Sequence, residues 1–163
     1  MKFLFRIFFS ILFTSLVTTA SMAQDAAAPL YLKQAHKSFY NKAYSDAIPQ
    51  YLYSVRKDTS FHEAVINLAD CYRLTNDAAN AEFWYKRVVT LKESQPIHQL
   101  YLGEALMKNK KYQEAKKWFE LYSRNAGDDS RGYERLQTLK QLNRYFKDSS
   151  YFKIKRININ SLE

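Results

Sequence analysis

The chain has 163 residues, of which 47% are hydrophobic and 16% aromatic, with a formal net charge of +9. This length is enough for one domain with a substantial core. Three glycines and three prolines are too few for a fibrous or loop-rich protein. The single cysteine, Cys71, excludes an internal disulfide and a multi-cysteine metal site.

The N-terminus has the pattern of an export signal. Lys2 and Arg6 precede an apolar run over 7–17, and Ser21-Met22-Ala23 places small residues at both positions that signal peptidase inspects. We therefore expect a signal peptide over 1–23 and an exported mature protein. An uncleaved anchor is the alternative, but the apolar run is short for a membrane span.

The positive charge is concentrated at the C-terminal end, because residues 130–163 hold eight Lys or Arg against three acids. An exported protein is not expected to bind nucleic acid. The basic end is suited to an acidic protein, anionic lipid headgroups or a cell-wall polymer, or it is a solvated helix face that aids solubility.

Small and aromatic side chains recur every 34 residues without an insertion, which indicates a repeated unit. Small residues let two antiparallel helices approach closely, and an aromatic residue one turn after the second small residue fills the gap between units. The two small columns are Ala35, Ala69, Gly103 and Ala47, Ala81, Ala115, and the aromatic column is Tyr51, Tyr85, Phe119.

The segments 69–72, 81–85 and 115–119 resemble the tetratricopeptide repeat (TPR) family, whose 34-residue unit has small residues at positions 8 and 20 and an aromatic at position 24. The resemblance covers about 28–129. It implies an all-α, right-handed solenoid of three helical hairpins. We expect TPR 1 over 28–61, TPR 2 over 62–95, TPR 3 over 96–129 and a capping helix over 130–147.

Turn and cap residues place the helix ends. Ser60 and Glu63 have the spacing of a capping box before the second repeat. The next helix is expected to begin near Asn76-Asp77, and Pro96 is suited to the first turn of another. The capping helix carries Leu136, Leu139, Leu142 and Phe146 on one side.

The last segment, 148–163, alternates like a β-strand at 151–155 and again at 157–160. It is either a frayed tail or the start of a β domain. Its position after TPR units resembles OmpA-family outer-membrane proteins, in which a TPR module precedes a TolB-like propeller and a peptidoglycan-binding domain. Some of these are associated with the type IX secretion system, so the resemblance implies a periplasmic protein, peripherally associated with the outer membrane.

By analogy with the family, the first helix of each hairpin lines a groove that binds a peptide or a partner protein. Aromatic residues are the expected anchors. The Lys/Asn/Arg set of a carboxylate clamp is absent. The alternative is a solvated groove with binding on a convex edge. The expected binding residues are His36, Phe39, Tyr40, Glu63, Asp70, Arg73, Glu104, Met107 and Lys108, and Leu100 is placed on the same surface.

His36, Asp70 and Glu104 form one column, and such groups bind divalent metals or act in acid–base chemistry. Neighbouring helix axes roughly 10 Å apart would hold them too far apart to converge, which favours a polar lining. We find no phosphate loop or hydrolase motif. The sequence therefore predicts a non-catalytic scaffold without cofactor or metal. Two alternatives are a self-associating spacer and an enzyme or small-ligand binder.

Overall fold

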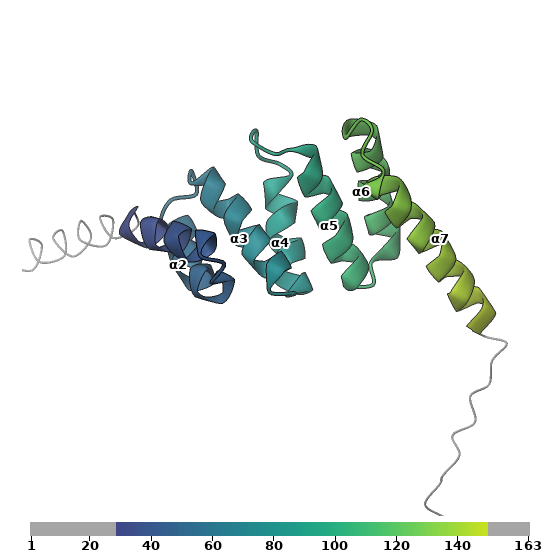
Figure 1. The fold of residues 1–163 in the computed structure, drawn as a ribbon, viewed down its shortest axis with the longest axis horizontal. Helices are drawn as coiled ribbons and strands as arrows, with labels where there is room; N and C mark the ends of the chain where they lie inside the picture. The colour runs from purple at the N-terminus through teal and green to yellow at the C-terminus, as the bar shows by residue number, and fades with distance from the viewer. Residues whose placement is uncertain (1–28, 150–163) are drawn as a thin grey trace, which may run out of the picture.

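The structure, a computed structural model, describes residues 29–149, which form helices and contain no strand. The helices stack in chain order along the long axis of the molecule (Figure 1). The predicted all-α solenoid is confirmed. The expected signal peptide and the strand-like segments beyond Ser149 lie outside the described residues. The helices span 29–40, α2 Tyr44–Lys57, α3 His62–Leu74, α4 Ala78–Val88, α5 Pro96–Lys108, α6 Tyr112–Asn125 and α7 Arg131–Ser149.

Packing between the helices is local. The main contacts join α2 to α3, α3 to α4, α4 to α5, α5 to α6 and α6 to α7. The helix over 29–40 packs on α2, where the ring centroids of Tyr31 and Tyr53 lie 4.3 Å apart. A stack in which each helix contacts mainly its neighbours in the chain is the arrangement of a solenoid.

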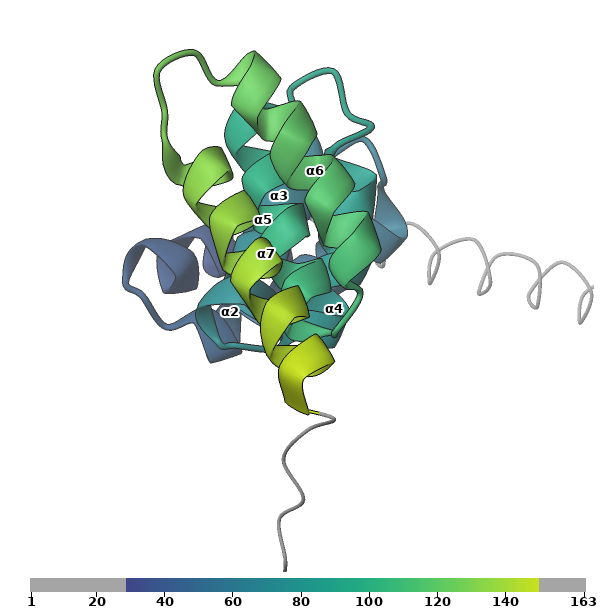
Figure 2. The same ribbon diagram turned by 90° about the vertical axis from the view of Figure 1, so that its right-hand side faces the viewer.

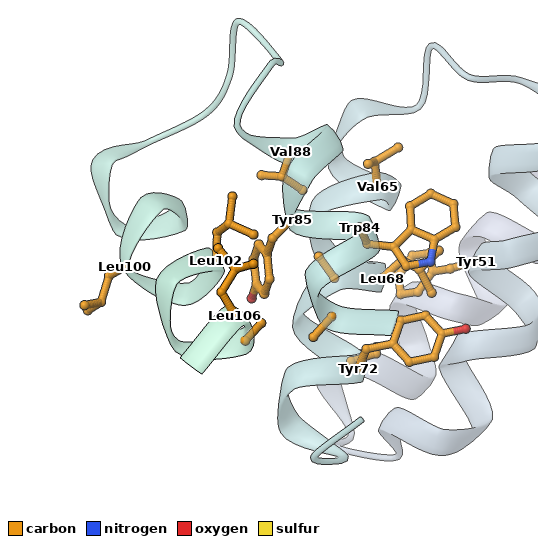
Figure 3. Packing of buried hydrophobic residues seen from close by; sticks show 14 of the residues in the cluster. Tyr51, Val65, Leu68, Tyr72, Trp84, Tyr85, Val88, Leu100, Leu102 and Leu106 are labelled. Carbon is orange, nitrogen blue, oxygen red and sulfur yellow. The ribbon is translucent and has the colours of Figure 1, made fainter. Parts of the chain in front are cut away.

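The two helices of each hairpin meet at the columns of small residues. Every alanine of the two columns is at most 1% exposed, and Gly103 is buried. The aromatic column lies between successive hairpins, and Tyr85 of α4 lies against Leu102 and Leu106 of α5 (Figure 3). Tyr51, Tyr85 and Phe119 are all fully buried. The residues expected to form the repeat core are thus all inside.

Two glycines mark where helices approach most closely. A Cβ atom added at Gly103 would lie 2.7 Å from Cδ1 of Phe119 and still nearer to Cε1 of that ring. A Cβ at Gly132 of α7 would lie 2.8 Å from Cδ1 of Tyr122 and closer still to Oγ of Ser123. Because atoms in contact normally stay about 3.5 Å apart, neither site has room for a side chain.

The turn inside each hairpin repeats with the same 34-residue interval. Lys42, Asn76 and Lys110 have φ angles of 63°, 61° and 62°. After each of them the chain closes the helix in the same way, as when the amide of Ala43 donates to the carbonyl of Ser38 at 2.9 Å. This is the Schellman pattern, which normally uses glycine. Two lysines in this backbone conformation are unfavourable.

The helix starts differ in how they are capped. The Asp77 carboxylate accepts a hydrogen bond from the amide of Asn80 at 3.1 Å and caps α4. The predicted capping box at Ser60 is wrong. The N-cap of α3 is Phe61, one residue later, so Glu63 lies a position too early to reach back. The amide of Ser60 donates instead to the Asp58 carboxylate at 2.8 Å.

A buried carboxylate joins the second hairpin to the third. Glu82 is 5% exposed and accepts hydrogen bonds from Lys86, Asn109 and Lys111, each at 2.7 Å. Burial by itself would raise the pKa of Glu82, but these three donors outweigh it and lower that pKa to about 2. Glu82 is therefore ionised, and its charge holds α4 against the turn between α5 and α6.

The terminal helix α7 covers the end of the stack and runs to Ser149, two residues beyond its expected end. Leu139 is 3% exposed, and Leu136 packs against the same core. Phe146 was expected on this apolar side, but it is 56% exposed and contacts Tyr112 at 5.9 Å between ring centroids. Within the described part of the chain, none of the helices is long and apolar enough to cross a membrane.

Candidate functional site

The residues expected to bind a partner lie on the first helices of the three hairpins, 29–40, α3 and α5. We call the surface that they form the A face. Leu100 of α5 was expected on this surface, but it is 1% exposed and belongs to the core. Tyr40, Glu63 and Lys108 are exposed, whereas His36, Phe39, Asp70, Arg73, Glu104 and Met107 are half-buried.

The column of His36, Asp70 and Glu104 does not converge on one point. Each residue has its own neighbours: His36 packs among aromatic rings, Asp70 bonds Tyr85, and Glu104 pairs with Arg135. Over residues 29–149, no three His, Cys, Asp or Glu side chains are grouped so that they would hold a metal ion. The arrangement is that of a polar lining on the first helices of three successive hairpins.

Asp70 and Arg73 form a cluster at the junction of the second and third hairpins. The Tyr85 hydroxyl donates to Asp70 at 2.5 Å, and Nε of Arg73 donates to the Tyr85 hydroxyl at 3.0 Å. Arg73 also pairs with Asp70 at 3.0 Å and lies 4.0 Å above the ring of Tyr101. Burial raises the pKa of Tyr85, and the Asp70 charge raises it further. The cluster therefore joins α3, α4 and α5.

A further 34-residue column completes these junctions and escaped the sequence-based expectations. It consists of Asn67, Tyr101 and Arg135, which occupy the same position in α3, α5 and α7. Asn67 donates to the Tyr51 hydroxyl at 3.1 Å, Tyr101 stacks under Arg73, and Arg135 pairs with Glu104 at 2.7 Å. Each thus contacts the preceding hairpin. Because the three residue types differ in size and charge, only their spacing would have revealed them.

The first hairpin gives the A face an aromatic end. The ring of His36 lies 5.6 Å from that of Tyr51 and 6.3 Å from that of Tyr40. Phe39 contacts Tyr40 and Tyr44, with centroids 5.7 and 5.6 Å apart. Tyr40 is 68% exposed although its neighbours are largely buried. It is therefore the aromatic side chain of this face with most surface available to a partner.

Three of the five charged residues of the A face have an ion pair within the chain. Arg73 pairs with Asp70, and Arg135 of α7 pairs with Glu104. Lys108 donates to the side chain of Asn76 at 2.7 Å. Glu63 is exposed and has no ion pair with a described residue. This face therefore offers no cluster of unpaired cations to an acidic ligand.

Cys71 is not placed for chemistry. It is fully buried, and burial raises the pKa of its thiol to about 12. A protonated thiol in the core is a poor nucleophile and a poor metal ligand. Cys71 acts as a small apolar side chain between α3 and its neighbours.

The helix order, the columns of small residues and the A face define a TPR-type α-solenoid. Solved structures of TPR domains share this fold. The first TPR domain of human RPAP3 has a TM-score of 0.60 and 22% identity, covering 77% of this chain and 98% of that chain. The first TPR of Spaghetti (RPAP3), bound to the HSP90 peptide SRMEEVD, has a TM-score of 0.61 and 22% identity, covering 74% and 95%.

The TPR domain of Sgt2 from Aspergillus fumigatus has a TM-score of 0.60 and 16% identity, covering 81% of this chain and 89% of that chain. No protein-family model matches the sequence, and no curated protein sequence matches it. At these identities the likeness concerns the fold alone.

Proposed function

We propose that this chain is a non-catalytic scaffold that binds a peptide or a partner protein through the A face. The observation that carries the proposal is the exposure of Tyr40, which is 68% exposed beside the half-buried Phe39 and His36. A large, exposed aromatic ring that contributes little to the core is a typical interface anchor.

A solved structure of the same fold supports this reading, since the first TPR of Spaghetti (RPAP3) is bound to a peptide. That peptide, SRMEEVD, is rich in acids. Here Arg73 and Arg135 are already paired with carboxylates of their own chain. We therefore expect apolar and aromatic contacts, rather than acidic groups, to dominate recognition on the A face.

We further propose that the chain acts in the bacterial cell envelope, within an outer-membrane or secretion complex. The signal-like segment over 1–23 and the order of signal, TPR units and strand-like tail support this location. N-terminal sequencing of the protein recovered from a periplasmic fraction tests it, with Gln24 as the expected first residue. Recovery of the protein with Met1 retained in the cytoplasm would contradict the proposal.

The binding proposal is tested by site-specific photocrosslinking in cells. A photoreactive phenylalanine analogue replacing Tyr40 should form a discrete crosslinked product with an envelope protein, and Tyr40→Ala should weaken capture of that protein about tenfold or more. Phe83 is the matched control, because it is an aromatic side chain 57% exposed on α4, outside the A face. Equal crosslinking from both sites, or capture unchanged by Tyr40→Ala, would count against the A face.

A further inference from the structure

A second surface lies at the C-terminal end of the stack. It is a groove between α6 and α7 with a volume of about 390 Å³. Figure 2 looks onto this end, where the two helices lie side by side. Leu136 and Leu139 of α7 line the groove together with Lys116 and Glu120 of α6 and Lys140 of α7. The groove thus has apolar side chains between charged ones, and it shares no residue with the A face.

The repeat register explains why the groove is open. Leu136 follows Leu102 by 34 residues, as Leu102 follows Leu68, so α7 corresponds to the first helix of a fourth hairpin. In the second and third hairpins, the first helix packs against a second helix, α4 or α6. Among the described residues no helix follows α7, so the groove lies where the second helix of a fourth hairpin would pack.

Contacts between earlier hairpins support this placement. Lys86 of α4 lies 3.8 Å from Glu114 of α6, and Glu82 of α4 pairs with Lys111, the N-cap residue of α6. These side chains therefore face the following hairpin. Lys116 and Glu120 are the residues 34 positions after Glu82 and Lys86, and both line the groove. The surface of α6 that would contact a fourth hairpin is therefore the surface that lines the groove.

The charge of the groove defines what fits it. Lys140 has no ion pair with a described residue, and Lys116 is 3.6 Å from Glu120. The sequence of α7 has five Lys or Arg residues against two acids. The groove has two lysines, Lys116 of α6 and Lys140 of α7, against one glutamate, Glu120 of α6, and α7 as a whole is positively charged, so the groove complements an acidic segment.

The two end segments of this chain outside α2 to α7 have the wrong charge for the groove. Residues 150–163 hold three Lys or Arg against one acid, and the helix over 29–40, at the other end of the stack, holds two lysines and no acid. Either would bring positive charge to Lys116 and Lys140. Like charges facing each other at an interface are unfavourable. Neither the chain's own C-terminal segment nor the first helix of a second copy is therefore a good occupant.

We propose that the groove between α6 and α7 binds an amphipathic, acidic helix of another protein, which takes the place of the second helix of a fourth hairpin. Its apolar side covers Leu136 and Leu139, and its carboxylates lie near Lys116 and Lys140. The proposal does not depend on the A face.

The test uses the full chain, as the cell processes it, and two labelled model helices of about 15 residues. Both have the same leucine and tryptophan positions, but one carries glutamates where the other carries lysines. Fluorescence anisotropy should show binding of the acidic helix alone. Lys140→Glu should weaken that binding about tenfold, because a neighbouring attraction becomes a repulsion. Lys117→Glu is the matched control, since Lys117 is exposed on α6 outside the groove.

Tyr40→Ala should leave the binding of the acidic helix unchanged, which separates this site from the A face. Binding of neither helix, equal binding of both, or equal effects of Lys117→Glu and Lys140→Glu would overturn the proposal. Concentration-dependent self-association in sedimentation velocity, abolished by Lys140→Glu, would overturn it as well, because the groove would then hold a second copy.

Discussion

Replacing Gly103 by alanine tests the packing of the third hairpin most directly. In a helix interior this exchange normally stabilises by about 0.5–1 kcal/mol. Here the new Cβ would meet the Phe119 ring, with Cδ1 at 2.7 Å and Cζ at 3.0 Å. Carbon atoms in contact prefer about 3.5–4.0 Å, so the ring has to move by roughly 1 Å. Phe119 is fully buried within the core, where side chains are closely packed, so moving its ring is costly.

Overpacking of this kind costs about 1–3 kcal/mol. Because the new Cβ would be too close to three atoms of one buried ring, we expect the upper part of this range, about 2–3 kcal/mol. After subtracting the gain in helix propensity, Gly103→Ala should lower the free energy of unfolding by about 1–2 kcal/mol. The melting temperature should fall by roughly 4–8 °C. Thermal and urea unfolding followed by circular dichroism measure both quantities.

A second substitution identifies the cause. Phe119→Leu removes Cε1, the ring atom nearest to the new Cβ, and Cζ, so Gly103→Ala should cost at least about 1 kcal/mol less in that background. Ala69→Gly at the equivalent position of the second hairpin is the control, and it should destabilise by about 1–2 kcal/mol, through lower helix propensity and the loss of a buried methyl group. If Gly103→Ala proved as stable as the parent chain, the close approach of α5 to Phe119 would be refuted.

Two further predictions concern Glu82 and Lys110. Because hydrogen bonding lowers the pKa of Glu82 to about 2, its contribution to stability is present above its ordinary pKa of 4.5 and is lost as the pH falls towards 2. Glu82→Gln should cost on the order of 2 kcal/mol at neutral pH and flatten the acid limb of the stability curve; the exposed Glu114→Gln should do neither. Lys110→Gly should stabilise by about 0.5–1 kcal/mol, because a lysine at a φ of 62° is unfavourable, whereas Lys37→Gly inside a helix should destabilise by about 1 kcal/mol. Urea unfolding of the four variants decides both, and a stabilising Glu82→Gln or a destabilising Lys110→Gly would contradict the respective reasoning.

Local features were predicted unevenly from the sequence. The sequence predicts the start of α4 after Asp77, because aspartate is a typical N-cap residue and the 34-residue repeat of Ala47, Ala81 and Ala115 places a helix there. The cap at Ser60 was misplaced by one residue, since the spacing of Ser60 and Glu63 fits a box that the start of α3 does not use. The left-handed turns at Lys42 and Lys110 were missed because lysine does not signal that conformation.

The expected binding residues differ in how exposed they are and in the contacts that they make within the chain. Tyr40, Glu63 and Lys108 are exposed, as a binding surface requires. Asp70 and Arg73 were expected to face a partner, but they bond to each other and to Tyr85. The position of a polar residue in the repeat does not tell whether its side chain contacts a ligand or a neighbouring hairpin, because residues of both kinds lie on the same helix face.

The repeat is determined by the sequence alone. Small residues and aromatic residues at a spacing of 34 determine that the helices pair and that the pairs stack, because size and period decide how closely two helices approach. Which side chains of different hairpins contact each other is not determined by this spacing. That Arg135 neutralises Glu104, and that α6 and α7 leave a groove with Lys140 at its side, follows from bringing together residues far apart in the sequence, and only the tertiary structure decides it.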